Sequence, residues 1–304
     1  MNIDILIIGG GVAGMTAALY AKRAGKSVLI LEKESFGGQI ASSPLVENYP
    51  TQKAITGLEL SNKIFEQICE IGVDFDCDEV IDLKKDEITN SFIITTPYTT
   101  HQAKSVVIAT GVKPRRINVP KEEEYIGHGI SYCAVCDGAF YKDKEVCVIG
   151  DANTAMQYAL MLADTSKKVT MCLLFDHFFG SKDLQDKVLN NNKIDIYYEV
   201  SLKELIGDKE ITSLRFENTK TKEELIIPSS CCFVAIGQEP HNDAFKALVD
   251  LDEQGYITSN ETETKTEGLF VAGDCRNKKI KQLTTAISDG TIAALNAVNY
   301  LNKK

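Results

Sequence analysis

Residues 3–32 read IDILIIGGGVAGMTAALYAKRAGKSVLILE, and this stretch decides the fold. An apolar strand leads into Gly-x-Gly-x-x-Gly, a helical pattern and a second apolar strand that ends at Glu32. Gly9 permits a tight turn, Gly11 lets a pyrophosphate approach the backbone, and Gly14 lets helix and strand pack closely. The helix N-terminus directs unpaired N–H groups at the phosphates. The stretch predicts a dinucleotide-binding βαβ unit with Glu32 on a ribose; an ordinary βαβ unit is the alternative.

The same unit recurs 141 residues later without gaps. A strand (145–149), a helix (154–163) and a further strand (169–173) repeat the pattern. Ala152 replaces the middle glycine and carries a methyl group where a pyrophosphate would come close. Leu173 replaces the ribose acid. The repeat predicts two nucleotide-type domains, of which only the first keeps the full binding chemistry.

Length and composition limit the class of protein. A chain of 304 residues is expected to form two domains, and 44% hydrophobic with 25% charged residues is ordinary for a soluble globular protein. No apolar run reaches the roughly 18 residues that a membrane span needs, and the N-terminus has no signal-peptide pattern. A net charge of -10 argues against nucleic-acid binding. We expect a cytoplasmic protein with no membrane and no nucleic acid among its partners.

Two apolar strands (106–111 and 233–237) are each followed by a proline, Pro114 and Pro240, and mark crossovers between domains. A later strand (269–274) and a helix (283–301) return to the first domain. We expect an α/β fold of two Rossmann-like three-layer domains, the second inserted in the first. The first domain is discontinuous, 1–115 and 241–304, and the second spans 116–240.

Residues 131–138 read SYCAVCDG, and their two cysteines carry the candidate chemistry. Cys133 and Cys136 are spaced to close a disulfide at the start of a helix, where a thiolate is stabilised. A zinc site needs four ligands, but there is no second Cys-x-x-Cys and the four histidines are scattered, so no metal site is expected. Inert core cysteines are the remaining alternative. Asp137 follows the pair and either passes protons during thiol–disulfide exchange or only favours the helix dipole.

Nine cysteines are an odd number, which disfavours a secreted disulfide framework. The seven cysteines outside the pair are expected to be buried small apolar residues: Cys69, Cys77, Cys147, Cys172, Cys231, Cys232 and Cys275.

A dinucleotide site together with one redox disulfide suggests a flavin, because a flavin exchanges electron pairs with a dithiol. The chain resembles the low-molecular-weight thioredoxin reductases over essentially its full length. The matching stretches are GGGVAG (9–14), GGQI (37–40), ENYP (47–50), ATG (109–111), YCAVCDG (132–138), GD (273–274) and KQLTTA (281–286).

This resemblance implies the fold of the FAD/NAD(P)-linked disulfide reductases, a homodimer, FAD in the first domain, and thioredoxin as a partner. Cys136 would face the flavin, and Cys133 would attack the disulfide of thioredoxin. The residues that would bind FAD are Gly9, Gly11, Val12, Ala13, Gly14, Glu32, Lys33, Gly38, Gln39, Asn48, Val80, Ala109, Thr110, Gly111, Gly273, Asp274, Lys281, Gln282 and Leu283.

The second domain departs from the family's pattern. NADPH-dependent members carry Gly-x-Gly-x-x-Ala followed, after the next strand, by a His-Arg-Arg cluster that holds the 2′-phosphate. Here GDANTA (150–155) and LLF (173–175) stand in their place. A dianionic phosphate over Leu-Leu-Phe has no cation, Asp151 adds a negative charge, and Leu173 offers no carboxylate to the ribose of NADH. Each lost charged contact costs about 1.5–3 kcal/mol. We therefore expect that NAD(P)H does not bind.

The ferredoxin-dependent flavin thioredoxin reductases of clostridia resemble this chain in lacking those motifs. The resemblance implies electron flow from reduced ferredoxin to FAD, to Cys133–Cys136, and then to thioredoxin. Three alternatives stay open: an NADPH-dependent enzyme with a diverged pocket, a diflavin-linked disulfide oxidoreductase, and a flavin-bound redox sensor. Ferredoxins are usually acidic, so docking needs a local basic patch. The candidates are Arg276, Lys278, Lys279 and Lys281 in one cluster, and Lys113, Arg115 and Arg116 in another.

Overall fold

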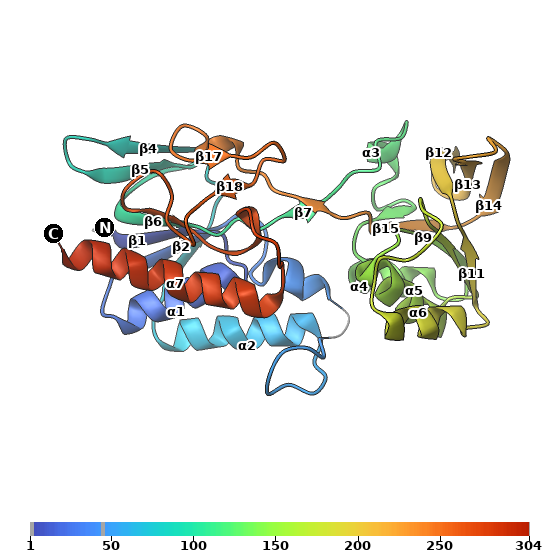
Figure 1. Cartoon of the computed structure of the whole chain (residues 1–304), viewed down its shortest axis with the longest axis horizontal. Helices are drawn as coiled ribbons and strands as arrows, with labels where there is room; N and C mark the ends of the chain where they lie inside the picture. Colours follow the sequence, from blue (N-terminus) through green and yellow to red (C-terminus); the bar gives the residue numbers. More distant parts are fainter. Residues whose placement is uncertain (1–2, 44–45, 304) are drawn as a thin grey trace. The chain divides into compact units, whose positions relative to one another are not determined.

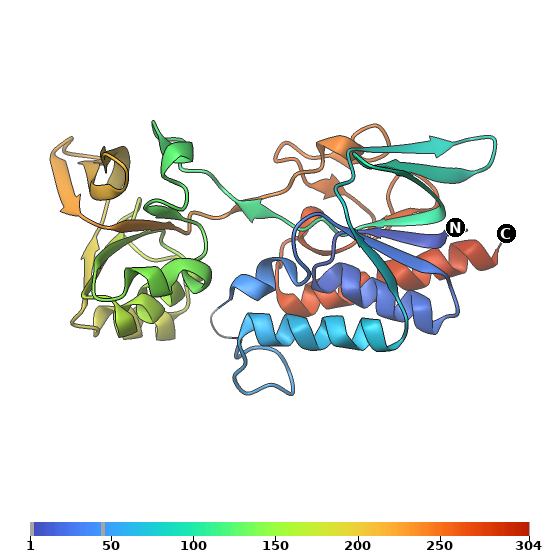
Figure 2. The ribbon, with the colours of Figure 1, turned by 180° about the vertical axis from the view of Figure 1, so that it is seen from behind.

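A computed structural model describes residues 3–43 and 46–303. The chain forms two compact units, Met1–Lys113 with Glu239–Lys304 (unit 1) and Pro114–Gln238 (unit 2). It crosses between them at β7 (Lys113–Pro114) and β16 (Gln238–Glu239), two short strands that pair with each other. The crossings lie two residues before the boundaries expected from the sequence. The predicted α/β fold with Rossmann-like sheets is confirmed (Figures 1 and 2).

Unit 1 is built on a seven-stranded sheet in the order β3-β2-β1-β6-β5-β4, with β19 paired to β6. Its parallel part holds β1 (Ile3–Ile8), β2 (Val28–Glu32), β3 (Asp74–Cys77), β6 (Thr100–Ile108) and β19 (Leu269–Val271). β4 (Asp82–Asp86) and β5 (Ser91–Thr95) continue it as an antiparallel hairpin. The central strands β1, β2 and β19 and the last residues of β6 are apolar and buried because both faces of this part are covered, whereas the edge strand β3 is exposed.

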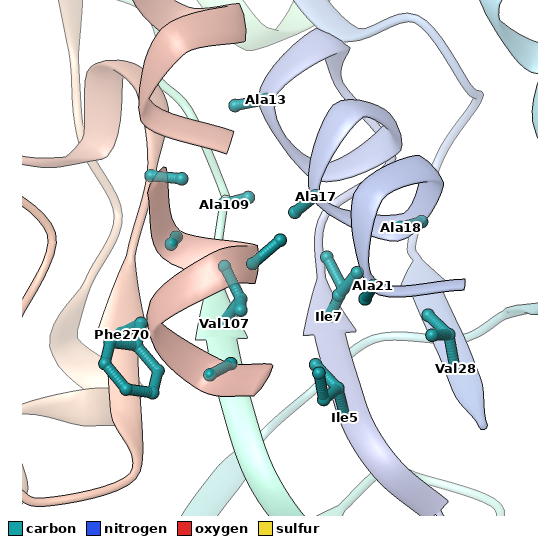
Figure 3. Packing of buried hydrophobic residues seen from close by; sticks show 14 of the residues in the cluster. Ile5, Ile7, Ala13, Ala17, Ala18, Ala21, Val28, Val107, Ala109 and Phe270 are labelled. Atoms are coloured by element: carbon teal, nitrogen blue, oxygen red, sulfur yellow. The ribbon is translucent and has the colours of Figure 1, made fainter. Parts of the chain in front are cut away.

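Three helices, α1 (Val12–Arg23), α2 (Gly57–Glu70) and α7 (Leu283–Asn302), cover one face of this sheet (Figure 1). Figure 3 shows alanines of α1, among them Ala17 and Ala21, lying over Ile5 and Ile7 of β1. These small side chains let α1 approach both the sheet and α7. Phe245, Val249 and Ile257 pack on the opposite face, so the unit has three layers. Short elements complete it: η1 (Gly38–Ser42), η3 (Asp243–Phe245), β17 (Asp250–Leu251), β18 (Ile257–Thr258) and η4 (Gly273–Cys275).

Unit 2 is built on a five-stranded parallel sheet in the order β11-β10-β9-β15-β8. Its strands are β8 (Ile130–Ser131), β9 (Glu145–Ile149), β10 (Lys168–Cys172), β11 (Ile194–Tyr197) and β15 (Cys231–Val234). Helices α4 (Ala134–Asp137), α5 (Asn153–Thr165) and α6 (Lys182–Leu189) lie on one side, with η2 (Gly138–Tyr141) after α4 (Figure 2). An antiparallel sheet of β12 (Val200–Gly207), β13 (Ile211–Asn218) and β14 (Glu224–Pro228) packs on the other side, and α3 (Glu122–Tyr125) precedes β8.

The repeat predicted from the sequence is present as β1–α1–β2 in unit 1 and β9–α5–β10 in unit 2. Among the residues that the structure describes, no helix has both the length and the apolar composition needed to cross a membrane.

Candidate active site

The glycine turn of unit 1 is shaped for a phosphate. Gly9 has a φ of 109°, and a Cβ there would lie 2.4 Å from the carbonyl oxygen of Ala109. A Cβ on Gly14 would lie 1.9 Å from the carbonyl oxygen of Gly9, so this position admits only glycine. Gly11 differs, because a Cβ there would meet nothing within 4 Å. The N-terminus of α1 therefore opens into free space at Gly11, which is the space that a pyrophosphate needs.

A cavity of about 360 Å³ lies beside this turn. Five of the predicted cofactor residues line it: Gly9, Glu32, Lys33, Val80 and Thr110. The carboxylate of Glu32 accepts hydrogen bonds from the N–H groups of Gly10 (2.7 Å) and Glu34 (2.9 Å), which fix it in the wall. Each carboxylate oxygen keeps a lone pair for a ribose hydroxyl. The wall also contains residues that no motif in the sequence indicated: Asp78, Glu79, Ile81, Val112, His241, Asp243 and Phe245.

Other predicted cofactor residues gather at the N-terminal ends of α1 and α7. A Cβ on Gly273 would lie 2.9 Å from the Cβ of Ala13, and one on Gly38 would lie 3.2 Å from the Cα of Gly11. Asn48 donates a hydrogen bond to Gln282, which precedes the first residue of α7 (3.1 Å). Segments far apart in the sequence thus meet around the glycine turn.

Asp274 leaves a buried acceptor at this place. Its buried Oδ1 forms an ion pair with the ammonium of Lys278 (3.0 Å) but accepts no hydrogen bond of good geometry within the described chain. The ion pair compensates the charge of this oxygen, and a lone pair remains for a hydrogen-bond donor of a ligand. The open glycine turn, the Glu32 wall and this oxygen fit the pyrophosphate, ribose and ribityl parts of FAD.

Asp289 of α7 organises the cations behind Asp274. Arg276 donates two hydrogen bonds to its carboxylate (2.9 and 2.7 Å), and Lys278 donates a third (3.0 Å). The N–H of Gly273 also donates to Asp289 (3.1 Å). Burial by itself would raise the pKa of Asp289, but the hydrogen bonds and charges of Arg276 and Lys278 outweigh burial and hold this pKa below its usual value. No motif singled out Asp289 in the sequence, because its partners lie 11 and 13 residues away along the chain.

The basic cluster around residue 278 is largely internal. The side chains of Arg276 and Lys278 are only 14% and 7% exposed and are paired with Asp289. The ammonium of Lys281 lies 3.3 Å from the ring centre of Tyr256. The expectation that Arg276 and Lys278 offer a docking surface is therefore wrong, because a buried carboxylate already binds both. Lys279 remains exposed.

The other basic cluster is partly paired as well. Lys113 forms an ion pair with Glu34 (2.5 Å), and the guanidinium of Arg116 lies over the ring of Tyr132, 5.0 Å from its centre. Arg115 is exposed and Arg116 keeps an exposed edge, so a weaker basic surface remains there.

In unit 2, Cys133 and Cys136 are joined by a disulfide. Cys133 caps the N-terminus of α4, and its Sγ accepts a hydrogen bond from the N–H of Cys136 (3.2 Å). Cys136 is exposed and Cys133 is half-buried. Asp137, the last residue of α4, lies 2.7 Å from the hydroxyl of Ser131. The predicted pair is thus a disulfide at a helix start with a carboxyl group in the same loop.

The other seven cysteines divide into two groups. Five are buried as expected: Cys147, Cys172, Cys231, Cys232 and Cys275. Burial raises the pKa of Cys147, Cys231 and Cys275, which keeps these thiols protonated and unreactive. Cys69 and Cys77 are exposed, so the expectation of burial is wrong for them. Cys77 ends the edge strand β3, and Cys69 lies near the end of α2 on its solvent side.

The glycine turn of unit 2 keeps its backbone shape, but Ala152 stands where unit 1 has Gly11. Gly150 has a φ of 141°, and a Cβ there would lie 2.3 Å from the carbonyl oxygen of Ala235, as Gly9 does against Ala109. Ala152 precedes α5 in extended backbone (φ −114°, ψ −175°), as Gly11 precedes α1 (φ −72°, ψ 178°). The methyl group of Ala152 therefore occupies the direction that Gly11 leaves open.

The segment that follows β10, residues 173–179, places aromatic side chains near the Gly150 turn. Leu173 is fully buried, whereas Leu174 and Phe175 are exposed. The rings of Phe175 and Phe179 lie 5.1 Å apart, and that of His177 lies 4.5 Å from Phe179. The N–H of Phe179 donates to the carbonyl oxygen of Asp151 (2.7 Å), so this segment is held directly against the turn. The Nδ1 atom of His177 lies within hydrogen-bond distance of the carboxylate of Asp176 (2.7 Å).

Within the described ranges, no three His, Cys, Asp or Glu side chains gather in a way that could hold a metal ion.

Comparison with known proteins places these features in a family. The model of the pyridine nucleotide-disulphide oxidoreductase family matches residues 3–290. The "34.2 kDa protein in rubredoxin operon" of Clostridium pasteurianum is 40% identical over 305 residues, covering 100% of this chain and 98% of the relative. A thioredoxin reductase of Bacillus subtilis is 38% identical, with 99% and 95% covered.

Solved structures agree with these relatives. A thioredoxin reductase of Lactococcus lactis matches with a TM-score of 0.96 at 34% identity, covering 100% of both chains. A ferredoxin-flavin thioredoxin reductase of Clostridium acetobutylicum matches with a TM-score of 0.54 at 28% identity, covering 100% of this chain and 99% of the other. The chain therefore belongs to the pyridine nucleotide-disulphide oxidoreductase family, and within it is an FAD-dependent flavoprotein of the thioredoxin reductase type.

Proposed function

We propose that this protein is a cytoplasmic enzyme that reduces the disulfide of thioredoxin with electrons from reduced ferredoxin, without NAD(P)H. Two reduced ferredoxins give up one electron each, two protons are taken up, and the disulfide of thioredoxin becomes two thiols. FAD, when bound, accepts electrons singly and exchanges them in pairs with a dithiol. The chain's own residues bind that cofactor, hold the redox pair and move the protons.

The hydrogen bond at Cys133 supports its role as the nucleophile. A thiolate is stabilised by an N–H group at a helix start, and the Sγ of Cys133 accepts the N–H of Cys136. In the reduced protein the thiolate of Cys133 attacks one sulfur of thioredoxin, and the disulfide of thioredoxin breaks. Cys136 then attacks Cys133, which releases the second sulfur of thioredoxin and restores the Cys133–Cys136 disulfide. Asp137 gives a proton to a departing thiolate in this exchange.

In unit 1, the open turn at Gly11 would take the pyrophosphate of FAD, Glu32 the ribose, and Asp274 the ribityl chain. The turn, the carboxylate wall and the buried acceptor oxygen support this assignment.

The observation that carries the donor proposal is the start of α5. The methyl group of Ala152 fills the direction that a pyrophosphate would need, and aromatic rings with Asp176 stand where a 2′-phosphate would need cations. Burial raises the pKa of Asp151, against smaller lowerings by a backbone hydrogen bond and by the charge of His177. A phosphate here would meet a methyl group and two carboxyl groups instead of a fork of donors.

The ferredoxin-flavin thioredoxin reductase of Clostridium acetobutylicum, similar over the whole chain, supports ferredoxin as the donor. The second candidate is an NADPH-dependent thioredoxin reductase with a rearranged pocket. The retained backbone of the Gly150 turn favours this candidate.

The test is an anaerobic titration that follows the absorbance of the bound flavin. NADPH, NADH and chemically reduced ferredoxin are added in separate cuvettes. We expect rapid bleaching by ferredoxin and none by either nucleotide. The Cys133→Ser variant should still be bleached by ferredoxin but should no longer reduce thioredoxin. Rapid bleaching by NADPH would overturn the donor proposal.

The same titration separates the other two alternatives. A diflavin-linked enzyme would be bleached by a reduced free flavin and not by ferredoxin. A flavin-bound redox sensor would be bleached but would show little turnover with thioredoxin.

A further inference from the structure

Ser131, the last residue of β8, is a buried serine whose hydroxyl joins both parts of the redox loop. Its Oγ accepts a hydrogen bond from the N–H of Cys133 (3.0 Å). The same oxygen lies 2.7 Å from Oδ2 of Asp137 and 3.2 Å from the carbonyl oxygen of Cys133. The side chain is 3% exposed, so it cannot touch a protein substrate.

The hydroxyl has two acceptors within reach and only one hydrogen to give. When Asp137 is a carboxylate, the hydrogen points to its Oδ2, which is the closer and charged acceptor. When Asp137 is protonated, the carboxylic acid becomes a donor to the Ser131 oxygen, and the hydroxyl hydrogen turns to the carbonyl of Cys133. The serine oxygen has two lone pairs, which then accept from Cys133 N–H and from the acid. Every group is satisfied in both states.

We propose that Ser131 is the positioning residue that holds the carboxyl group of Asp137 beside the cysteine pair in both of its protonation states. This inference rests on the proposed function, in which Asp137 gives a proton to a departing thiolate. Because β8 is hydrogen-bonded to β15 at Ser131, the hydroxyl is fixed to the sheet, while Asp137 lies at the end of the four-residue helix α4. Ser131 therefore ties the end of this short helix to the sheet.

The other titratable groups near Asp137 do not hold its carboxyl group. Tyr141 on η2 and Cys231 on β15 feel the charge of Asp137, and burial raises the pKa of both. Tyr158 on α5 has its pKa raised by burial and donates to the carbonyl of Tyr132. All three are neutral near pH 7, and in the described part of the chain the side-chain donor that bonds the carboxylate of Asp137 is Ser131.

Cys133, Cys136 and Asp137 account for every proton that the exchange with thioredoxin moves. The dithiol of the reduced protein carries two protons on Cys133, Cys136 or Asp137 beyond those of the oxidised protein, and reduced thioredoxin carries the same two at the end. Asp137 loses a proton when a sulfur of thioredoxin leaves, and it regains one from the remaining thiol of the pair. Ser131 neither gains nor loses a proton.

The experiment compares two disulfides in their reaction with the prereduced protein. The variants Ser131→Ala, Ser131→Thr and Asp137→Asn are reduced with stoichiometric dithionite and mixed with oxidised thioredoxin or with 5,5′-dithiobis(2-nitrobenzoate). The aromatic thiolate that leaves the second compound is stable and needs no proton. Ser229→Ala is the matched control, because Ser229 is also 3% exposed and its hydroxyl bonds the carbonyl two residues on.

We expect Ser131→Ala to reduce thioredoxin about tenfold more slowly, the size of effect that one lost hydrogen bond to a charged group gives, and to reduce the aromatic disulfide at the unchanged rate. Ser131→Thr should restore the thioredoxin rate, Ser229→Ala should leave both rates unchanged, and Ser131→Ala should add nothing to Asp137→Asn. Equal slowing of both disulfides, or slowing that multiplies with Asp137→Asn, would overturn the proposal.

Two outcomes separate this inference from the proposed function. If Asp137→Asn leaves the thioredoxin rate unchanged, the acid role of Asp137 fails and the role of Ser131 fails with it. If Asp137→Asn slows thioredoxin reduction and Ser131→Ala does not, only the role of Ser131 fails. Should Ser131→Ala unfold, the isosteric pair Ser131→Thr and Ser131→Val makes the same comparison.

Discussion

At the scale of the residue, Asp289 is the charged group on which the cofactor side of unit 1 depends. Its carboxylate compensates Arg276 and Lys278, all three nearly buried. Removing one member of a buried ion pair leaves a charge without a partner and costs about 3–5 kcal/mol. We therefore expect Asp289→Asn to lower the free energy of unfolding at pH 7 by about 3 kcal/mol, measured by urea denaturation. The exposed pair Lys187–Asp183 supplies the control, since Asp183→Asn should change stability by less than about 1 kcal/mol.

The same carboxylate predicts how stability depends on pH. Burial acts to raise the pKa of Asp289, but Arg276 and Lys278 hold the folded-state pKa below the value of about 4 that an unfolded aspartate has. The stability that this group adds is therefore complete above about pH 4 and disappears as the pH falls through the lower folded-state pKa. The difference in stability between the natural chain and Asp289→Asn should be constant from pH 6 to 8 and should shrink in acid. A difference that persists unchanged at low pH contradicts this account.

At the scale of the element, the proposal that NADPH is not the electron donor can be tested by building a nucleotide site at the start of α5. The triple variant Ala152→Gly, Leu174→Arg, Phe175→Arg frees the turn and adds two cations. Each new charged hydrogen bond is worth about 1.5–3 kcal/mol, so binding of NADPH should strengthen by roughly two to four orders of magnitude. Isothermal titration calorimetry measures this.

Two controls accompany that variant. NADH lacks the 2′-phosphate and should gain far less than NADPH. A variant with Ala152→Gly and Ile226→Arg, which places a cation on an exposed residue of β14 in the same unit, should gain little. Equal strengthening of NADH and NADPH would indicate unspecific charge attraction instead of a rebuilt site.

The elements that the sequence predicted are those with strong local patterns. The two βαβ units and the cysteine pair at a helix start follow from glycine spacing and apolar runs, and each is present. The network of Asp289 could not be predicted, because it depends on the packing of α7 against η4. The same packing buries Arg276 and Lys278, which read as surface residues in the sequence. Exposure of Cys77 likewise depends on β3 being a sheet edge, which only tertiary structure decides.

At the scale of the whole molecule, the homodimer implied by the family resemblance remains a proposal. Unit 1 carries exposed apolar side chains on the three helices that cover one face of its sheet: Tyr20 on α1, Leu58 on α2 and Leu295 on α7. Surface of this kind is what a partner copy covers. We expect a native mass of twice 33.5 kDa by sedimentation. Leu295→Asp should shift the mass toward 33.5 kDa while FAD stays bound, and a natural chain that sediments as a monomer refutes the proposal.

The pairing of β7 with β16 means that the chain leaves and re-enters unit 1 at one place. An insertion whose two ends are neighbours behaves as a cassette. Such a unit can be replaced, or can lose a function, without any change in the path of the chain through unit 1. Ala152, Leu174 and Phe175, which depart from the pattern of the NADPH-dependent family members, all lie inside this cassette. The glycine turn of unit 1 keeps the family's pattern. A lineage could therefore change its source of electrons by altering one exchangeable module and keep the rest of its flavin chemistry.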